Sequence, residues 1–315
     1  MTDVILQNIT KTYNKGAVTA VKGVTFEVAR GELFGLIGPD GAGKTSIFRI
    51  LTTLLLPDGG TASVRGCDVV RDYKTIRRKV GYMPGKFSLY PDLSVEENLT
   101  FFATLFQTTV ADNYEMVRDI YEQLAPFKNR RAGKLSGGMK QKLALCCALI
   151  HRPEVLFLDE PTTGVDVVSR KEFWDILQRL RQQGITILVA TPYMDEATLC
   201  ERIALMQNGS IMSIASPDEI VRRFPDRLFA AKAKDMGRLL RDLRADSKVK
   251  SCYSFVEYHN LTLQDQKERL TDALLQDLQQ LGHRHVTLQP VHPGIEDCFI
   301  RLMAERPEHE NQDRK

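Results

Sequence analysis

Residues 33–45, LFGLIGPDGAGKT, decide the fold of this chain. The continuous apolar run LFGLI is typical of a strand that is buried on both faces of a sheet. It leads into GPDGAGKT at residues 38–45, which fits the pattern G-x-x-x-x-G-K-[ST], and the helical pattern SIFRILTTLL follows. A buried strand, a glycine-rich turn and a helix in this order predict a phosphate-binding loop at the edge of a sheet.

The residue types in this loop suit a nucleoside triphosphate bound with Mg²⁺. Glycines let the backbone curl so that its N–H groups face phosphate oxygens. Lys44 supplies a positive charge for the β- and γ-phosphates, and the Thr45 hydroxyl is a ligand for Mg²⁺. A glycine-rich turn that binds nothing is the alternative, and the flanking strand and helix argue against it. The predicted binding residues are Gly38, Pro39, Asp40, Gly41, Ala42, Gly43, Lys44, Thr45 and Ser46.

A second motif, VLFLDE at residues 155–160, places two carboxylates at the end of another buried strand. Ligands of open α/β sheets bind at the carboxyl edge of the strands, so both acids are expected beside the phosphate-binding loop. Asp159 is predicted to hold Mg²⁺, directly or through water, and Glu160 to polarise the attacking water. A strand that simply ends in solvated acids is the alternative, and the loop at residues 38–45 makes it the weaker one.

The remaining pattern of residues 1–217 predicts one α/β domain. ITILVAT at 185–191 is a third buried run and SRKEFWDILQRLRQQG at 169–184 is a helical pattern, as in a parallel sheet flanked by helices. VILQNIT at 4–10 and VTFEVAR at 24–30 alternate apolar and polar residues. This alternation predicts half-buried antiparallel strands.

A largely helical insert is predicted within this domain, over about residues 86–151. Ser94 and Glu97 form the S-x-x-E capping box that begins a helix through VEENLTFFATLF. Further on, LSGGMKQ at residues 135–141 precedes a second helical run, LALCCALI, and Ser136 is placed to cap it. Small residues and a hydroxyl at a helix start make a second phosphate-binding arrangement.

The combination of these motifs resembles the ATP-binding cassette (ABC) ATPases, whose signature is LSGGQ-like. The resemblance covers about residues 3–215 and implies a P-loop NTPase cassette with a parallel-sheet core, an antiparallel β subdomain and a helical insert, which binds ATP and Mg²⁺. It implies that Lys44 and Glu160 are catalytic, and that the signature completes the site of a second cassette, self or paralogue. An ordinary serine-capped helix would account for Ser136 but not for the combination. The signature residues are Leu135, Ser136, Gly137, Gly138 and Met139.

Two further positions match landmarks of the family. Tyr13, in KTYNKG, lies where the family places an aromatic ring that stacks on adenine. Taken alone, a tyrosine at the end of a strand is more often a packing residue. Residues 163–166, TGVD, resemble the D-loop, so Asp166 is expected to face the partner cassette.

Two positions depart from the family pattern. In VGYMPGKFSLYPDLSVEENL the family has a Gln that contacts Mg²⁺ and the attacking water, and Gly85 stands in its place. In ILVATPYMDEATLC it has a His that contacts the γ-phosphate, and Pro192 stands there. Neither residue has a side-chain hydrogen-bond donor, and such groups are typically worth a few kcal/mol of barrier each. We expect nucleotide binding to survive and hydrolysis by a homodimer to be slow.

Three segments resemble the cassettes of bacterial ABC-2 type exporters of the daunorubicin-resistance group: VGYMPGKFSLYPDLSVEENL, TPYMDEATLCERIALMQNGSI and PGIEDCFIRLM. The resemblance implies a cytoplasmic subunit, peripheral on the inner face of the cell membrane, that drives separate integral-membrane permease subunits. Export and the drug class rest on this resemblance alone. A non-transport ABC ATPase is one alternative. A regulatory cassette that switches by binding alone is another, which Gly85 and Pro192 favour and Glu160 opposes.

The composition narrows the class of protein. The 315 residues include 43 basic and 40 acidic ones, a net charge of +3 that is too balanced for a nucleic-acid binder, so no nucleic-acid partner is expected. The six cysteines form no CxxC pair, which indicates buried thiols in a reducing compartment. No stretch approaches the roughly 18 consecutive apolar residues of a membrane span, and the first residues lack the pattern of a signal peptide.

Residues 218–305 are predicted to form a small α+β accessory domain, followed by a polar tail at 306–315. The expected order of elements is β-α-β-β-α-β with a final helix, IEDCFIRLMAE, which matches the ferredoxin-like pattern. The hairpin in VKSCYSFVEYHNLTLQ is predicted to turn near His259–Asn260. Three histidines lack the spacing of metal ligands and are expected at the surface: His283, His285 and His292.

Overall fold

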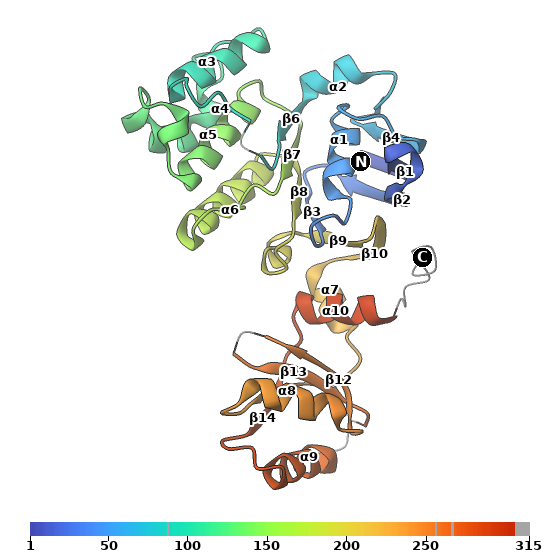
Figure 1. Cartoon of the computed structure of the whole chain (residues 1–315). Coiled ribbons are helices and arrows are strands. Elements are labelled where there is room, and N and C mark those ends of the chain that lie inside the picture. Colours follow the sequence, from blue (N-terminus) through green and yellow to red (C-terminus); the bar gives the residue numbers. More distant parts are fainter. Residues whose placement is uncertain (87, 256, 266–267, 306–315) are drawn as a thin grey trace. The chain divides into compact units, whose positions relative to one another are not determined.

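The computed structural model describes residues 1–86, 88–255, 257–265 and 268–305. The predicted polar tail at 306–315 lies outside the described residues. The chain divides into two compact units, Met1–Pro217 and Asp218–Lys315, which are described separately. Figure 1 shows the elements of each unit.

The first unit is built on a six-stranded sheet in the order β10-β9-β3-β8-β7-β6. All neighbours pair in parallel except β10, which pairs with β9 in antiparallel fashion. Every residue of the three predicted buried runs is buried where it forms a strand, so the predicted parallel core is confirmed. The strands are β3 (Leu33–Ile37), β6 (Val80–Met83), β7 (Val155–Asp159), β8 (Thr186–Thr191), β9 (Arg202–Gln207) and β10 (Ser210–Ala215).

A second, antiparallel sheet has the order β2-β1-β4-β5. Along β2 the apolar residues Val24, Phe26 and Val28 are buried and the residues between them are exposed, as the alternation of the sequence predicts. The strands are β1 (Thr2–Tyr13), β2 (Val18–Ala29), β4 (Gly59–Val64) and β5 (Cys67–Asp68).

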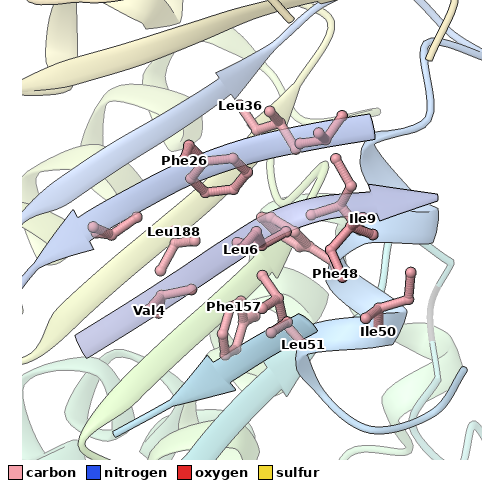
Figure 2. Close-up of a cluster of buried hydrophobic side chains, with 14 of the residues drawn as sticks. Val4, Leu6, Ile9, Phe26, Leu36, Phe48, Ile50, Leu51, Phe157 and Leu188 are labelled. Carbon is pink, nitrogen blue, oxygen red and sulfur yellow. The ribbon is translucent and has the colours of Figure 1, made fainter. Parts of the chain in front are cut away.

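Helix α1 (Lys44–Leu51) contributes buried side chains to a core cluster that also contains residues of both sheets. Figure 2 shows Phe48 and Leu51 of this helix among side chains of β1, such as Leu6, and of the parallel strands, such as Phe157. The rings of Phe48 and Phe157 meet edge to face with centroids 5.6 Å apart. The phosphate-binding loop is therefore attached to a helix that is packed on both sides.

The predicted helical insert is confirmed. Ser94 caps its first helix with the full capping box, in which Ser94 Oγ accepts from Glu97 N and Ser94 N donates to Glu97 Oε2. Figure 1 shows its helices α3, α4 and α5 grouped together. Besides α1, the α-helices of residues 1–216 are α2 (Tyr73–Lys79) before the insert, α3 (Val95–Leu105), α4 (Tyr114–Leu124) and α5 (Gly137–Leu149) within it, and α6 (Val167–Gln182) after it. Short 3-10 helices are η1 (Asn14–Gly16), η2 (Ala125–Phe127), η3 (Ala132–Lys134) and η4 (Asp195–Leu199).

The second unit has an antiparallel sheet in the order β12-β13-β11-β14, and its elements follow one another as the ferredoxin-like pattern predicts. Leucines of two of its helices, such as Leu239 and Leu274, form the buried core with the sheet. The elements are α7 (Pro217–Arg222), β11 (Leu228–Lys232), α8 (Met236–Ala245), β12 (Val249–Ser254), β13 (His259–Leu263), α9 (Glu268–Gln280), β14 (Thr287–Val291) and α10 (Ile295–Glu305).

Two predictions for the second unit are wrong. The hairpin does not turn at His259–Asn260, because both side chains have partners that hold these residues in β13: His259 Nε2 lies 2.7 Å from Met236 O, and Asn260 Nδ2 donates to Asp297 Oδ1. The turn lies earlier, where Phe255 N donates to Tyr258 O. His283 is buried rather than at the surface, since its ring contacts the carboxylate of Asp242 at 2.7 Å.

Within the described residues, no helix is long and apolar enough to cross a membrane, and no group of three or more His, Cys, Asp or Glu residues could hold a metal ion. Four of the six cysteines are buried, as predicted, while Cys67 and Cys252 are half-buried.

The packing of α1 predicts how the first unit responds to a core substitution. Phe48→Ala should lower its free energy of unfolding by about 3–5 kcal/mol, because the lost ring leaves a cavity between the sheets. Urea unfolding followed by the fluorescence of Trp174, the only tryptophan of the chain, reports on this unit because that residue is buried in α6. Phe101→Ala, at a ring that is 40% exposed, is the control and should cost about 1 kcal/mol or less. Equal losses would contradict the assignment of Phe48 to the core.

Candidate active site

The phosphate-binding loop lies at the carboxyl end of β3 and leads into α1, as predicted. Gly43 has φ +105°, a conformation that favours glycine, and a Cβ atom there would lie 2.3 Å from the carbonyl oxygen of Ala20. A Cβ on Gly38 would lie 2.1 Å from Met206 O. The loop backbone thus packs against β2 and β9 so closely that these two positions require glycine.

Lys44 is held inside this loop. The residue is only 3% exposed, and Nζ donates to the carbonyl oxygens of Gly38 at 2.6 Å and Pro39 at 2.9 Å. Burial lowers the pKa of Lys44 because it desolvates the ammonium group, and the nearby charges of Glu160, Asp40 and Asp159 oppose this shift. A cation is therefore fixed by backbone carbonyls where phosphate oxygens would need one.

Thr45 and Asp159, the two predicted Mg²⁺ ligands, are in contact. Thr45 Oγ1 donates to Asp159 Oδ1 at 3.2 Å. Burial raises the pKa of Asp159, while this hydrogen bond lowers it. A hydroxyl and a single carboxylate are hard oxygen donors, and Mg²⁺ in phosphate sites commonly uses one or two carboxylates with phosphate oxygens and water. The residues present therefore fit Mg²⁺ bound together with a triphosphate.

Glu160 follows the end of β7 at the same edge of the sheet. Its backbone is left-handed, with φ +51°, which is uncommon for a residue with a side chain. Glu160 N donates to Ala190 O of β8 at 2.8 Å, and Glu160 Oε2 accepts from Thr163 Oγ1 at 3.4 Å. Such strained backbone is often found where a side chain must be aimed at a site.

Tyr13 ends β1 beside the loop helix. Its hydroxyl lies 3.0 Å from Ser46 Oγ, so the two predicted binding residues are joined by a hydrogen bond. This contact attaches the end of the antiparallel sheet to the first turn of α1.

The two departures from the family pattern both lie at this site. A Cβ atom on Gly85 would lie 3.1 Å from Asp159 O and 3.6 Å from Glu160 Cβ, so a side chain there would project beside the two acids. Pro192 directly follows β8, whose last residue Thr191 accepts a hydrogen bond from Gly38 N of the loop at 3.3 Å. Gly85 thus lies beside the two acids and Pro192 one residue from a contact with the loop, and neither residue has a side-chain donor.

The signature residues cap α5 and contact the D-loop segment. Ser136 Oγ accepts from Met139 N at 3.3 Å, as predicted for a helix cap. A Cβ on Gly137 would lie 2.9 Å from Gly164 O, and one on Gly138 would lie 2.6 Å from Ser169 Oγ. Glycines at these two positions therefore let the signature pack directly on residues 164–169.

Asp166 caps the following helix, α6. Its carboxylate accepts from Ser169 N at 3.0 Å, and this bond lowers the pKa of Asp166. The next two residues are unusually exposed for apolar side chains, since Val167 is 81% and Val168 69% exposed. The D-loop thus ends in an apolar surface with no cover within this unit.

An apolar groove of about 460 Å³ lies between the helical insert and the sheet, and the sequence motifs did not point to it. Its walls come from the turn after α1 and from α2, β6, α3 and α5, segments that are far apart in the chain, so only folding reveals it. The side chains of Leu54 and Leu105 at the groove are 58% and 61% exposed. The groove is lined by Thr52, Leu54, Arg77, Val80, Tyr82, Met83, Pro84, Ser88, Leu89, Phe102, Leu105, Phe106, Ala144, Cys147, Ala148 and His151.

This chain is similar to known proteins over most of its length. A family model described as ABC transporter matches residues 21–163. The chain is 37% identical over 288 residues to the probable multidrug ABC transporter ATP-binding protein YbhF of Escherichia coli K12, which covers 90% of this chain and 49% of YbhF. The chain therefore spans about half the length of that relative.

Two other known proteins are matched over nearly their whole length. The doxorubicin resistance ATP-binding protein DrrA of Mycobacterium tuberculosis is 36% identical over 319 residues, which covers 97% of this chain and 95% of DrrA. A dimeric ATP-binding cassette in a post-hydrolysis state, bound to ADP and Pi, is 26% identical with a TM-score of 0.62 and covers 68% of this chain and 98% of its own. The resemblance inferred from the motifs is confirmed: this chain belongs to the ATP-binding proteins of ABC transporters.

Proposed function

We propose that this ABC ATPase binds and hydrolyses MgATP as the motor subunit of a multi-subunit exporter. The observation that carries the proposal is the meeting of Lys44, Thr45, Asp159 and Glu160 at one edge of the parallel sheet. The names of the relatives, multidrug transporter and doxorubicin resistance protein, support export of drug-like molecules.

In this site each residue has one task. The loop amides and Lys44 bind the β- and γ-phosphates, and Tyr13 packs against the adenine. Thr45 and Asp159 hold Mg²⁺, which neutralises charge on the phosphates. Glu160 accepts a proton from the attacking water, and the strained backbone aims its carboxylate. The nucleotide is bound by residues 38–46 with Tyr13.

We assign the signature, Leu135 to Met139, to the nucleotide site of a second cassette, either a copy of this chain or a paralogue. Ser136 and Gly137 are exposed, so their hydroxyl and amide groups are open to a ligand from outside. The exposed Val167 and Val168 beside Asp166 suit contact with such a partner, because burying them would remove apolar surface from water. The similar cassette bound to ADP and Pi is itself described as a dimer.

We assign the apolar groove to a permease subunit that spans the membrane, with this chain peripheral on the inner face of the cell membrane. Its exposed leucines are the kind of surface that a partner helix covers. The groove includes Met83 and Pro84, which directly precede Gly85, so an occupant would lie next to the acids of the site. The nearly balanced charge gives no support to a nucleic-acid partner.

A second function is favoured by Gly85 and Pro192. Without side-chain donors at these positions, the cassette is suited to switch by binding ATP and to hydrolyse it slowly. In that case its signature serves a more active site on a paralogue. The turnover experiment below separates the two functions.

Nucleotide binding is tested with Lys44→Ala. Its affinity for MgATP should fall about tenfold or more, because hydrogen bonds to a charged group contribute about 1.5–3 kcal/mol. Isothermal titration calorimetry on the purified chain measures this change. Lys232→Ala, at an exposed lysine of β11, is the control and should bind as the wild type does. Unchanged affinity in Lys44→Ala would remove the basis of the proposed function.

The departures are tested by restoring the family residues together, in Gly85→Gln/Pro192→His. The ATPase rate should rise about tenfold or more, because single donors of this kind change rates by about 100-fold in other enzymes. Gly85 has room for a side chain after a small shift, since its Cβ would lie 3.1 Å from Asp159 O. The same pair of changes in a Glu160→Gln background should give no increase. A rate equal to that of the wild type would show that neither position limits hydrolysis.

The permease contact is tested with Leu105→Glu, which places a charge in the groove. Recovery of the chain with candidate permease subunits in detergent should fall several-fold, while MgATP affinity stays unchanged, because burying an unpaired charge costs several kcal/mol. Leu281→Glu, at a leucine of the second unit that is 51% exposed, is the matched control. If both variants were recovered equally well with the permease, the groove would not be its docking site.

A further inference from the structure

Among the buried carboxylates of the first unit that belong to none of the assigned motifs, Glu196 is the one whose partners lie beside the site. Glu196, in η4, is only 1% exposed. Its two oxygens accept hydrogen bonds of 2.6 Å, Oε1 from Thr162 Oγ1 and Oε2 from Thr191 Oγ1, and Arg170 Nε lies 3.6 Å from Oε1. Burying a carboxylate is costly unless its oxygens are paired, so these contacts hold Glu196 in one position.

The partners of Glu196 connect the segments that form the active site. Thr162 lies two residues after Glu160, and Thr191 directly precedes Pro192. The carbonyl of Thr191 accepts from Gly38 N at the start of the phosphate-binding loop. The carboxylate of Glu196 therefore links the segments that follow β7 and β8. It is also connected to the phosphate-binding loop through a single residue, Thr191, whose hydroxyl contacts Glu196 and whose carbonyl contacts Gly38.

Proline at 192 makes this link more important. Pro192 has no backbone N–H, so it cannot fix the turn after β8 with a hydrogen bond of its own. The turn is held instead by Thr191 Oγ1, which accepts from Tyr193 N at 3.1 Å and donates to Glu196. The guanidinium of Arg170, on the helix that follows the D-loop, lies 4.3 Å from the centre of the Tyr193 ring and closes the cluster.

We propose that Glu196 is a positioning residue for ATP hydrolysis, which fixes the segment of Glu160 and the turn at Pro192 relative to the phosphate-binding loop. This inference rests on the proposed function. Glu196 acts through Thr162 and Thr191 and does not contact the reacting atoms. A misplacement of about 1 Å at a reacting group can cost about 100-fold in rate. Because residues 85 and 192 offer no side-chain donors, we expect the rate of hydrolysis to depend more strongly on the exact position of Glu160.

The test compares Glu196→Gln with Glu32→Gln. The glutamine keeps the shape of Glu196 but replaces one acceptor oxygen with an NH₂ group, so one threonine hydroxyl loses its acceptor. We expect kcat to fall about tenfold or more while the Kd for MgATP stays within about twofold. Glu32 is a matched control because it is 6% exposed, accepts from Ala29 N and Arg202, and lies at the opposite end of β3 from the loop. Glu32→Gln should retain the wild-type kcat.

A second pair of variants guards against a general loss of structure. Thr162→Val removes the hydroxyl at nearly constant volume and should lower kcat as Glu196→Gln does, whereas Thr162→Ser should recover most of that rate. Trp174 fluorescence during urea unfolding confirms that each variant is folded. If the wild-type rate is too low to compare, the same changes are made in Gly85→Gln/Pro192→His.

The outcomes separate the inference from the function on which it depends. Normal kcat in both Glu196→Gln and Thr162→Val would overturn the positioning role and leave the ATPase assignment intact. An equal loss of MgATP affinity and kcat would also overturn it, since that would indicate a role in folding the whole site. No hydrolysis by either the wild type or Gly85→Gln/Pro192→His would instead overturn the proposed function.

Discussion

The edge-to-face contact between Phe48 and Phe157 is the interaction on which the site depends. Phe48 belongs to α1 and Phe157 to β7, so their packing sets the distance between the loop helix and the strand that ends in the two acids. The hydrogen bond from Thr45 to Asp159 joins the same two elements at the site. Because α1 is also covered by the antiparallel sheet, the helix has little freedom to shift. The polar chemistry of the site is thus positioned by an apolar core.

Motifs that are local in sequence were predictable, and contacts between distant segments were not. Composition and periodicity predict the loop at residues 38–45 and the strand before Asp159, because the geometry of both depends on residues that are neighbours in sequence. Glu196 gives no such signal, since its partners lie 34 residues before it and 5 residues before it, and a single Glu in a polar stretch suggests an exposed acid. His259 and Asn260 were misplaced for the same reason: polar residues favour turns locally, but buried partners hold them in a strand.

The binding and the hydrolysis that we propose for this chain depend on different parts of the site. The groups that bind a triphosphate, Lys44 and the loop amides, are held by backbone geometry that requires glycine at particular points. The side chain proposed to assist hydrolysis, Glu160, lies on the turn after β7, while the turns after β6 and β8 carry Gly85 and Pro192, which have no side-chain donors. A cassette of this kind can lose catalytic side chains one at a time while its affinity for nucleotide is unchanged, because the geometry of the phosphate-binding loop does not depend on those side chains.

The glycines of the signature have a consequence for communication between two cassettes. Gly137 and Gly138 press against Gly164 and Ser169, in the segment that continues from Glu160. The signature, which we assign to the nucleotide of a second cassette, therefore packs on the segment that follows this chain's own Glu160. In the proposed pair, a movement of the segment after Glu160 would reach the signature by direct contact, so the two nucleotide sites would be coupled without any additional relay.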